Sequence, residues 1–261
     1  MKKKLFLVCL LPSLAGFLTF YVVPFFYSFY YAFIDNAFSR EFVWFDNFIK
    51  IIQNESFQNA MFNTMRFTLT AVPLIMVLSF VTAQLTVFFA MRVPFIKRAF
   101  FLPFVLPSAV IVVFWQTYFG GVPPFTSLLA CFLWKYSGIN IMLLMTAISR
   151  LPAEYFEAAK IDGAGRVRQS VNIVLPLISP TLFFTCILSV VNSFKIFKES
   201  YLLYGQYPDP DVYMLQNYLN NHFLKLNYQN ISVAAIIFFT LIYILVAVAF
   251  YLEKRAGERI W

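Results

Sequence analysis

The chain has 261 residues, of which 61% are hydrophobic, 20% are aromatic and only 12% are charged, and its formal net charge is +8. Soluble domains carry about 25% charged residues, so this composition excludes an ordinary soluble enzyme or binding domain and indicates a membrane protein. A basic soluble protein would suggest a nucleic-acid partner, but these bases form no single patch along the sequence, so no nucleic acid is expected.

Four long stretches of the sequence contain no Asp, Glu, Lys or Arg. They are residues 5–34, 67–91, 99–134 and 226–252. A helix needs roughly 20 apolar residues to cross the hydrocarbon core of a bilayer, so each stretch is long enough to span it. The first stretch is too long and too aromatic for a cleavable signal peptide, and we interpret it as the first membrane helix.

Two glycines and two prolines between residues 120 and 124 divide the third stretch into two spans joined by a tight turn. We therefore expect an all-α integral membrane protein that forms a single transmembrane domain over residues 1–261. Its six membrane helices are expected at 6–33, 61–91, 99–119, 126–149, 177–198 and 229–252. Lys135 falls within the fourth helix, where it can extend outward to the interface or face the interior.

The distribution of Lys and Arg favours one orientation in the membrane. If both termini are cytoplasmic, the cytoplasmic segments are 1–4, 92–98, 150–176 and 253–261. These segments hold 13 of the 20 bases and 5 of the 12 acids. Because cytoplasmic loops are enriched in Lys and Arg, we expect both termini to lie on the cytoplasmic side.

The polar segment 150–176 interrupts an otherwise apolar sequence between the fourth and fifth helices. Pro152 suits the first turn of a helix, and Glu154 suits the positive end of its dipole. Asp162-Gly163 then predicts a sharp turn that residues with a Cβ resist. The spacing predicts one close-packing helix face, which carries Tyr155, Ala158, Ala159 and Asp162.

Neither a catalytic centre nor a metal site is expected in this chain. Cys9, Cys131 and Cys186 all fall in apolar stretches without a CxxC spacing, and His222 is the only histidine. The sequence has no GxxxxGK[ST] stretch, so any ATP must be bound and hydrolysed by another polypeptide. The predicted helices hold almost no ionisable residues, which speaks against a proton-coupled carrier.

Polar and aromatic residues at membrane depth are the candidates for lining a solute path, since a sugar needs hydrogen bonds and aromatic faces in an apolar wall. The candidates are Gln84, Trp115, Gln116, Tyr118, Asn140, Asn192 and Ser193. The alternative for each is a hydrogen bond to a neighbouring helix, worth around 1 kcal/mol. Asn192, in the fifth helix, is the first choice.

One motif within 150–176 resembles a known pattern at every specified position. Glu157-Ala158-Ala159 is followed after three residues by Gly163, and nine residues later by Ile173 and then Leu175-Pro176. This is similar to the EAA loop of permease subunits from binding-protein-dependent ABC importers. The sequence AKIDGA narrows the resemblance to the carbohydrate branch of MalF-like and UgpA-like permeases. Weaker likenesses at WFDNF (44–48), RAFFLP (98–103) and SFKIFKESYLL (193–203) occur in the family's order.

The resemblance implies a non-catalytic permease with the type I importer fold, resident in the bacterial plasma membrane. Its expected partners are a second permease, forming a heterodimer, two ATPases that use ATP and magnesium, and an extracellular solute-binding protein. The chain itself is expected to bind no cofactor. The residues that the resemblance assigns to ATPase coupling are Glu157, Ala158, Ala159, Asp162, Gly163, Ile173, Leu175 and Pro176.

The resemblance leaves the solute open. A sugar or oligosaccharide is the first hypothesis, and glycerol 3-phosphate, a polyamine or another small polar solute is the alternative. A phosphate would favour bases at the path, and Lys135 and Lys195 are the suggestive ones. A passive channel or a membrane enzyme is the alternative from another class. Compared with the family, the outer segment between the third and fourth helices is short, little more than GGVPP.

Overall fold

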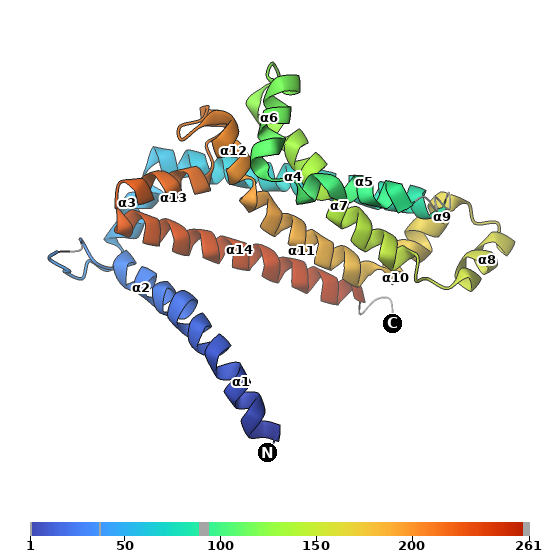
Figure 1. The fold of residues 1–261 in the computed structure, drawn as a ribbon, viewed down its shortest axis with the longest axis horizontal. Helices are drawn as coiled ribbons and strands as arrows, with labels where there is room; N and C mark the ends of the chain where they lie inside the picture. Colours follow the sequence, from blue (N-terminus) through green and yellow to red (C-terminus); the bar gives the residue numbers. More distant parts are fainter. Residues whose placement is uncertain (1, 37, 89–93, 258–261) are drawn as a thin grey trace. The chain divides into compact units, whose positions relative to one another are not determined.

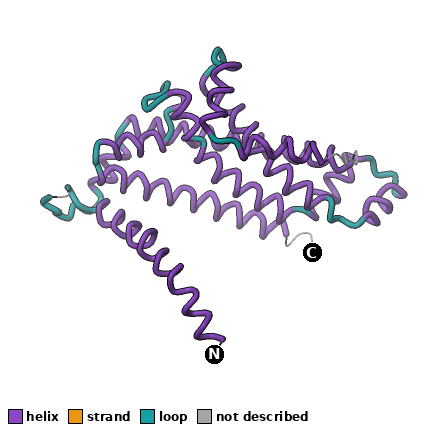
Figure 2. The backbone as a smooth tube through the Cα atoms, viewed as in Figure 1, coloured by secondary structure: helices purple, strands orange, loops and turns teal. Residues whose placement is uncertain are grey.

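The computed structural model of this chain describes residues 2–36, 38–88 and 94–257, without the side chains of 2–9, 94–98 and 252–257. Over these ranges the chain is helical with short loops and no β-strand, apart from an isolated bridge between Ile34 and Phe42 (Figures 1 and 2). The expectations for residues 89–93, for the side chain of Cys9 and for the last residues of 253–261 lie outside this description.

The chain forms two compact units, of which the first comprises residues 1–60 and 215–242. This unit opens with helices α1 (Lys2–Phe17) and α2 (Val23–Ala32), joined by the π-helical turn η1 (Leu18–Val22). Pro24 lacks the N–H that an α-helix would use here, which accounts for the π-helical turn directly before it. The remaining helices of this unit are α3 (Asp46–Ile52), the first turns of α4 (Glu55–Phe88), α13 (Leu215–Leu224) and the first half of α14 (Tyr228–Gly257).

The second unit comprises residues 61–214 and 243–261 and contains most of the helices. Besides the rest of α4 and α14, its elements are α5 (Pro94–Val105), α6 (Ser108–Phe119), α7 (Pro124–Ile148), α8 (Ala153–Ile161), α9 (Arg166–Gln169), η2 (Ser170–Val174), α10 (Leu175–Leu177), α11 (Ser179–Lys195), α12 (Phe197–Tyr204) and η3 (Pro210–Val212).

Six membrane spans fit the described chain, as the sequence predicts. Five helical stretches are long and apolar enough to cross a bilayer, and a sixth span arises if the bent pair Ala99–Val105 and Ser108–Phe119 is counted as one. The predicted third helix, 99–119, is not continuous, because the chain turns by 108° between these two pieces. Pro107 causes the break, since it lacks an amide hydrogen and disfavours helical backbone at Leu106.

The second and fifth spans also differ from the predicted boundaries. Helix α4 begins at Glu55, six residues before the predicted start at 61, because the Asn54 side chain accepts a hydrogen bond from the Phe57 N–H at 3.0 Å. The fifth span continues beyond residue 198 as α12, which ends at Tyr204. Both differences lie in polar segments, where hydrophobicity alone carries little information about helix ends.

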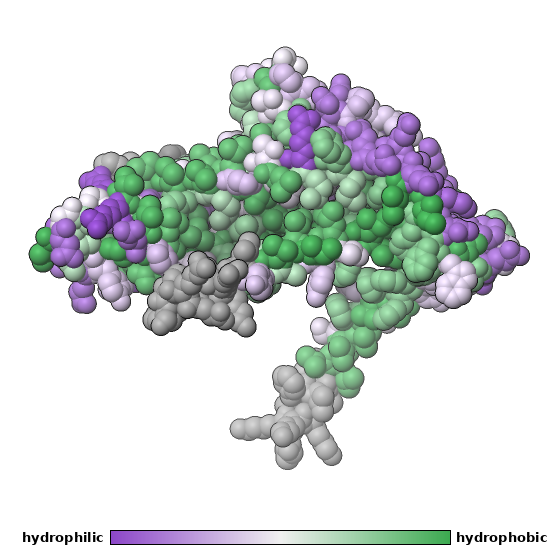
Figure 3. Space-filling model, turned by 180° about the vertical axis from the view of Figure 1, so that it is seen from behind, coloured by the Kyte–Doolittle hydropathy of each residue, from purple (hydrophilic) through white to green (hydrophobic). Residues whose placement is uncertain are grey.

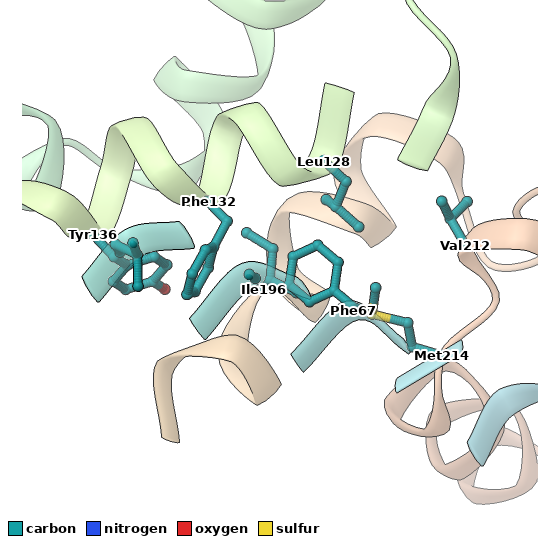
Figure 4. Close-up of a cluster of buried hydrophobic side chains, with 9 residues drawn as sticks. Phe67, Leu128, Phe132, Tyr136, Ile196, Val212 and Met214 are labelled. Carbon is teal, nitrogen blue, oxygen red and sulfur yellow. The ribbon is translucent and has the colours of Figure 1, made fainter. Parts of the chain in front are cut away.

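The second unit is held together by packed hydrophobic clusters. In one of them, Phe67 of α4 packs edge-to-face on Phe132 of α7, with ring centroids 5.6 Å apart (Figure 4). Ile196, between α11 and α12, and Met214 join the same cluster. Burying a large apolar side chain contributes about 1.5–3 kcal/mol, so this cluster fixes α4, α7 and the segment after α11 against one another.

At Gly138 of α7, the backbones of α5 and α7 lie too close together for any residue that has a Cβ. A Cβ built on Gly138 of α7 would lie 1.7 Å from the backbone oxygen of Phe100 in α5. Small residues allow this backbone approach, a common basis of helix packing in membranes. On the face seen in Figure 3, hydrophobic side chains cover much of the helical surface, as expected for helices in contact with lipid.

Candidate functional site: the 150–176 segment

The 150–176 segment folds as the sequence predicts, as a short helix followed by a sharp turn. Helix α8 starts after Pro152 and ends at Ile161, and Gly163 adopts a left-handed φ of 74°. The Gly163 N–H donates to the Lys160 oxygen at 3.0 Å, and the Ala164 N–H donates to the Ala159 oxygen at 2.8 Å. This pair of bonds is a Schellman motif, which favours glycine because most side chains disfavour the left-handed conformation.

The two sides of α8 differ in exposure. Tyr155, Glu157, Ala158 and Asp162 are exposed, and Ile161 at the end of the helix is 86% exposed. Ala159 is buried, so the predicted single face for Ala158 and Ala159 is wrong in part: the two neighbouring alanines point to different surroundings. The helix therefore presents an outward surface that is partly apolar, to which Ile161 was not predicted to belong.

The inward side of α8 is fixed to the membrane helices. The ring of Phe156 lies edge-to-face against that of Phe88 at the end of α4, with centroids 6.2 Å apart. Phe156 also packs on the cluster that contains Ile148 of α7, Val174 of η2 and Ile178 before α11. A force applied to α8 would thus reach α4, α7 and α11 through packed side chains. Phe156 was not among the predicted site residues, although an aromatic residue inside a polar segment is a usable signal.

The return from α8 to the membrane is held by hydrogen bonds. The Gln169 side chain donates to the Ala164 oxygen at 2.8 Å, and the Ser170 hydroxyl donates to Gln84 of α4 at 2.8 Å. The remaining motif residues, Ile173, Leu175 and Pro176, are half-buried where the chain re-enters the membrane helices. A cavity of about 480 Å³ adjoins these elements, lined among others by Phe88, Phe156, Lys160 and Gln169.

The predicted solute-path residues are mostly buried and join helices. Asn140 of α7 donates to Ser189 of α11 at 2.7 Å, and Ser193 of α11 lies 3.0 Å from the hydroxyl of Thr68 in α4. Asn192 is 4% exposed. These contacts correspond to the alternative considered from the sequence, in which polar residues hold neighbouring helices together.

The remaining path candidates lie on α4 and α6. Gln84 receives the bond from Ser170 described above. Trp115 is buried and donates its ring N–H to the Ser127 oxygen at 3.0 Å, whereas Gln116 and Tyr118 are exposed, Tyr118 by 71%. The seven predicted residues are therefore distributed over four helices with different surroundings, and their role in solute passage stays a prediction.

Lys135 faces the interior, which decides between the two alternatives considered for it. Its ammonium group pairs with the carboxylate of Glu199 on α12, which is fully buried. The Ser108 hydroxyl, at the start of α6, donates to the same Glu199 oxygen at 2.6 Å and accepts from Lys135 at 3.2 Å. The carboxylate thus lies at the positive end of α6, which stabilises a negative charge there. This group of three residues joins α6, α7 and α12.

No metal centre is formed within the described residues, where no three His, Cys, Asp or Glu side chains come together to hold an ion. The two cysteines whose side chains the structure describes, Cys131 and Cys186, are free thiols.

The sequence matches a protein family described as "Binding-protein-dependent transport system inner membrane component" over residues 6–257. A similar relative is the probable starch degradation products transport system permease protein AmyD of Thermoanaerobacterium thermosulfurigenes. It is 25% identical, and the alignment covers 95% of this chain and 93% of the relative. The sn-glycerol-3-phosphate transport system permease protein UgpA of Pectobacterium atrosepticum is 28% identical, with 72% of each chain covered.

Solved structures show the same fold. A chain of a bacterial ABC transporter involved in the import of the acidic polysaccharide alginate has a TM-score of 0.78 and 19% identity, and the match covers 97% of this chain and 96% of that chain. A chain of the bacterial alginate ABC transporter in complex with alginate pentasaccharide-bound periplasmic protein has a TM-score of 0.79 and 20% identity, with coverage of 98% and 96%.

Proposed function

This chain belongs to the inner membrane components of binding-protein-dependent transport systems, and we propose that it is one membrane-spanning subunit of an ATP-driven importer for a sugar or oligosaccharide. The family match covers residues 6–257, nearly the whole chain, and carries the assignment. The expected sugar is supported by the similarity to a permease for starch degradation products, which extends over 95% of this chain.

In this proposal the chain is not itself an enzyme, and its 150–176 segment lies in the cytoplasm and receives the movement of a separate ATPase. Helix α8 would sit in a groove of that ATPase, with Ala158 and Ile161 in contact and Glu157 accepting charge-assisted hydrogen bonds. When the two ATPases close on ATP, α8 moves, and the contact between Phe156 and Phe88 passes the movement to α4. The transporter then shifts between two existing states, one open outward and one open inward.

The partners proposed are those of the family: a second permease, two ATPase subunits, and a solute-binding protein outside the cell. Transport of an alternative solute, glycerol 3-phosphate, has support in the similarity to UgpA. Against a phosphate, Lys135 is already neutralised by Glu199, so it offers no uncompensated charge to an anion. Lys195, at the end of α11, is exposed and remains the base to test for an anionic solute.

The experiment that tests this function is uptake into proteoliposomes that contain the complete transporter with its binding protein. We expect labelled malto-oligosaccharide to accumulate only when ATP is present at the ATPase side, with glycerol 3-phosphate and spermidine failing to compete. Equal solute entry with and without ATP would identify a passive channel and contradict the proposal. Competition by glycerol 3-phosphate would be consistent with an importer but would identify a different solute.

The coupling role of α8 is tested by two substitutions of the same size at Gly163. Asn and Asp both adopt the left-handed conformation more readily than other residues, and the position has open space for a Cβ. Gly163→Asp adds a negative charge beside Asp162, and we expect it to leave folding intact but uncouple uptake from ATP hydrolysis. Gly163→Asn is the neutral control and should transport. Normal uptake by the Asp variant would remove the coupling argument.

A further inference from the structure

The short helix α3 presents an apolar stripe that no other part of its unit covers fully. Phe45, at the position before the helix, is 60% exposed, and Ile49 and Ile52 are 52% and 53% exposed. Phe48 lies with them and is half-buried. These four positions follow the spacing i, i+3, i+4, i+7, which places them within about 100° of arc on a helix. A second side of the helix, with Asn47 and Ile51, is buried.

The charged residues of α3 form a third side of the helix. Asp46 and Lys50 are both exposed, are four residues apart and therefore lie on the same side of the helix, about 130° from the stripe centre. The helix thus has three sides: one packed against protein, one charged and one apolar. A three-sided arrangement of this kind suits a helix that lies where water, lipid and protein meet.

The position of α3 is fixed relative to the end of the first span. The Asn47 side chain donates to the backbone oxygens of Ala32 and Ile34 at 3.0 and 2.8 Å, and Asn47 is 7% exposed. Ile34 also pairs with Phe42 in the isolated bridge, and the Val43 N–H donates to the Phe33 oxygen at 2.9 Å. These bonds join α3 to the last turn of α2, so the stripe cannot swing away from the level at which that span ends.

An unusual backbone conformation adds to the apolar surface just before α3. Trp44 has a φ of 49°, in the left-handed region that bulky residues rarely adopt. Its side chain is 67% exposed and lies against Phe42, with ring centroids 4.9 Å apart. Such strain costs of order 1–3 kcal/mol and tends to occur where a side chain has a function. Here it holds an indole out of the protein, next to the stripe.

The geometry points to a lipid partner: we infer that Trp44, Phe45, Phe48, Ile49 and Ile52 dip into the headgroup boundary of the bilayer and anchor α3 flat on the membrane surface. One candidate span ends at Ala32 and the next begins at Glu55, so the chain between them is short and held at this level. The stripe therefore lies at the level where the first span ends. Tryptophan is enriched at this depth in membrane proteins.

A protein that binds reversibly fits this stripe less well than lipid does. Surfaces that bind a partner reversibly are about as polar as the rest of a protein surface and carry hydrogen-bonding groups. The stripe offers none, except the indole N–H of Trp44, and its charged residues lie to one side, as headgroup contacts require. The inference does not depend on which side of the membrane α3 occupies, nor on the transported solute.

Spin labels on α3 test the inference in the full chain, with Cys9, Cys131 and Cys186 replaced and the protein reconstituted in lipid nanodiscs. Single cysteines are placed at Ile49 and Ile52 in the stripe, and at Lys50 as a control on the charged side of the same helix. All three side chains are exposed, so the labels should leave the fold unchanged. The readout compares how often each label collides with oxygen, which concentrates in lipid, and with a nickel chelate, which stays in water.

We expect oxygen to relax the labels at 49 and 52 more strongly than the nickel chelate does, and the opposite order at 50. Stronger relaxation by nickel at 49 and 52 would mean that the stripe faces water, which overturns the inference. Immobile labels shielded from both agents would mean that another protein covers the stripe, which also overturns it. Because no transport is measured, these outcomes are independent of the proposed importer function.

Discussion

The buried pair of Lys135 and Glu199 makes a sharp prediction about stability. Glu199 has no exposed surface and the Lys135 side chain is 10% exposed, so either charge alone would remain in an apolar interior. Removing one partner of a buried pair costs about 3–5 kcal/mol. Ser108 keeps a hydrogen bond to whichever partner remains, which offsets part of this cost. We therefore expect Lys135→Met and Glu199→Gln each to lower the free energy of unfolding by about 3 kcal/mol.

The double variant Lys135→Met/Glu199→Gln should lose much less free energy of unfolding than the two single variants lose in sum, because no uncompensated charge is left. We expect non-additivity of at least about 2 kcal/mol. The assay is reversible unfolding in mixed detergent micelles. Lys198→Met, at an exposed lysine next to Glu199 in the sequence, is the matched control and should change stability by less than about 0.5 kcal/mol. Single effects that add within about 0.5 kcal/mol would refute the reasoning, since the two charges would then be independent.

Three further predictions follow from single residues. Gly138→Ala should destabilise the protein by about 1–3 kcal/mol in the same unfolding assay, because its Cβ would overlap α5, whereas Gly121→Ala, with open space around it, should be nearly neutral. Phe156→Ala should speed hydrogen exchange in α8 and weaken coupling of uptake to ATP hydrolysis, because it frees α8 from α4; unchanged exchange would contradict the anchoring described above. Burial lowers the pKa of His222 below 6.5. The unfolded chain therefore binds the proton more readily, so stability should fall as pH drops below about 6.5, and His222→Gln should reduce this dependence.

The sequence predicts the spans well because lipid imposes a simple requirement. An uncharged stretch of roughly 20 residues has few alternatives to a membrane helix, and residues 67–88 and 228–252 are helical as expected. The break at Pro107 was missed because proline is tolerated inside membrane helices, and its effect depends on the packing of both flanking pieces. The early start of α4 depends on one side-chain bond from Asn54, which hydrophobicity does not report.

The sequence predicts the turn of the 150–176 segment correctly, but it does not predict which residues share a face of α8. Gly163 directly after Asp162 signals a left-handed turn, and the Schellman bonds are present. The assignment of Ala158 and Ala159 to one face failed because α8 is short and its orientation is set by the aromatic contact of Phe156. In the same way, the sequence could not tell whether Lys135 turns inward, because its partner Glu199 lies 64 residues away along the chain.

The central claim is that α8 is the element through which an ATPase drives this permease, and cross-linking from Ile161 tests it most directly. Ile161 is 86% exposed, so a photo-reactive amino acid can replace it without disturbing packing. In membranes that hold the complete transporter, we predict a cross-link to the ATPase subunit whose yield changes when ATP is added. The same probe at Tyr207, in the loop after α12, should give none. A probe at 161 that never reaches the ATPase would contradict the account, and so would labelling of a cysteine at 161 by a membrane-impermeant thiol reagent from outside the cell.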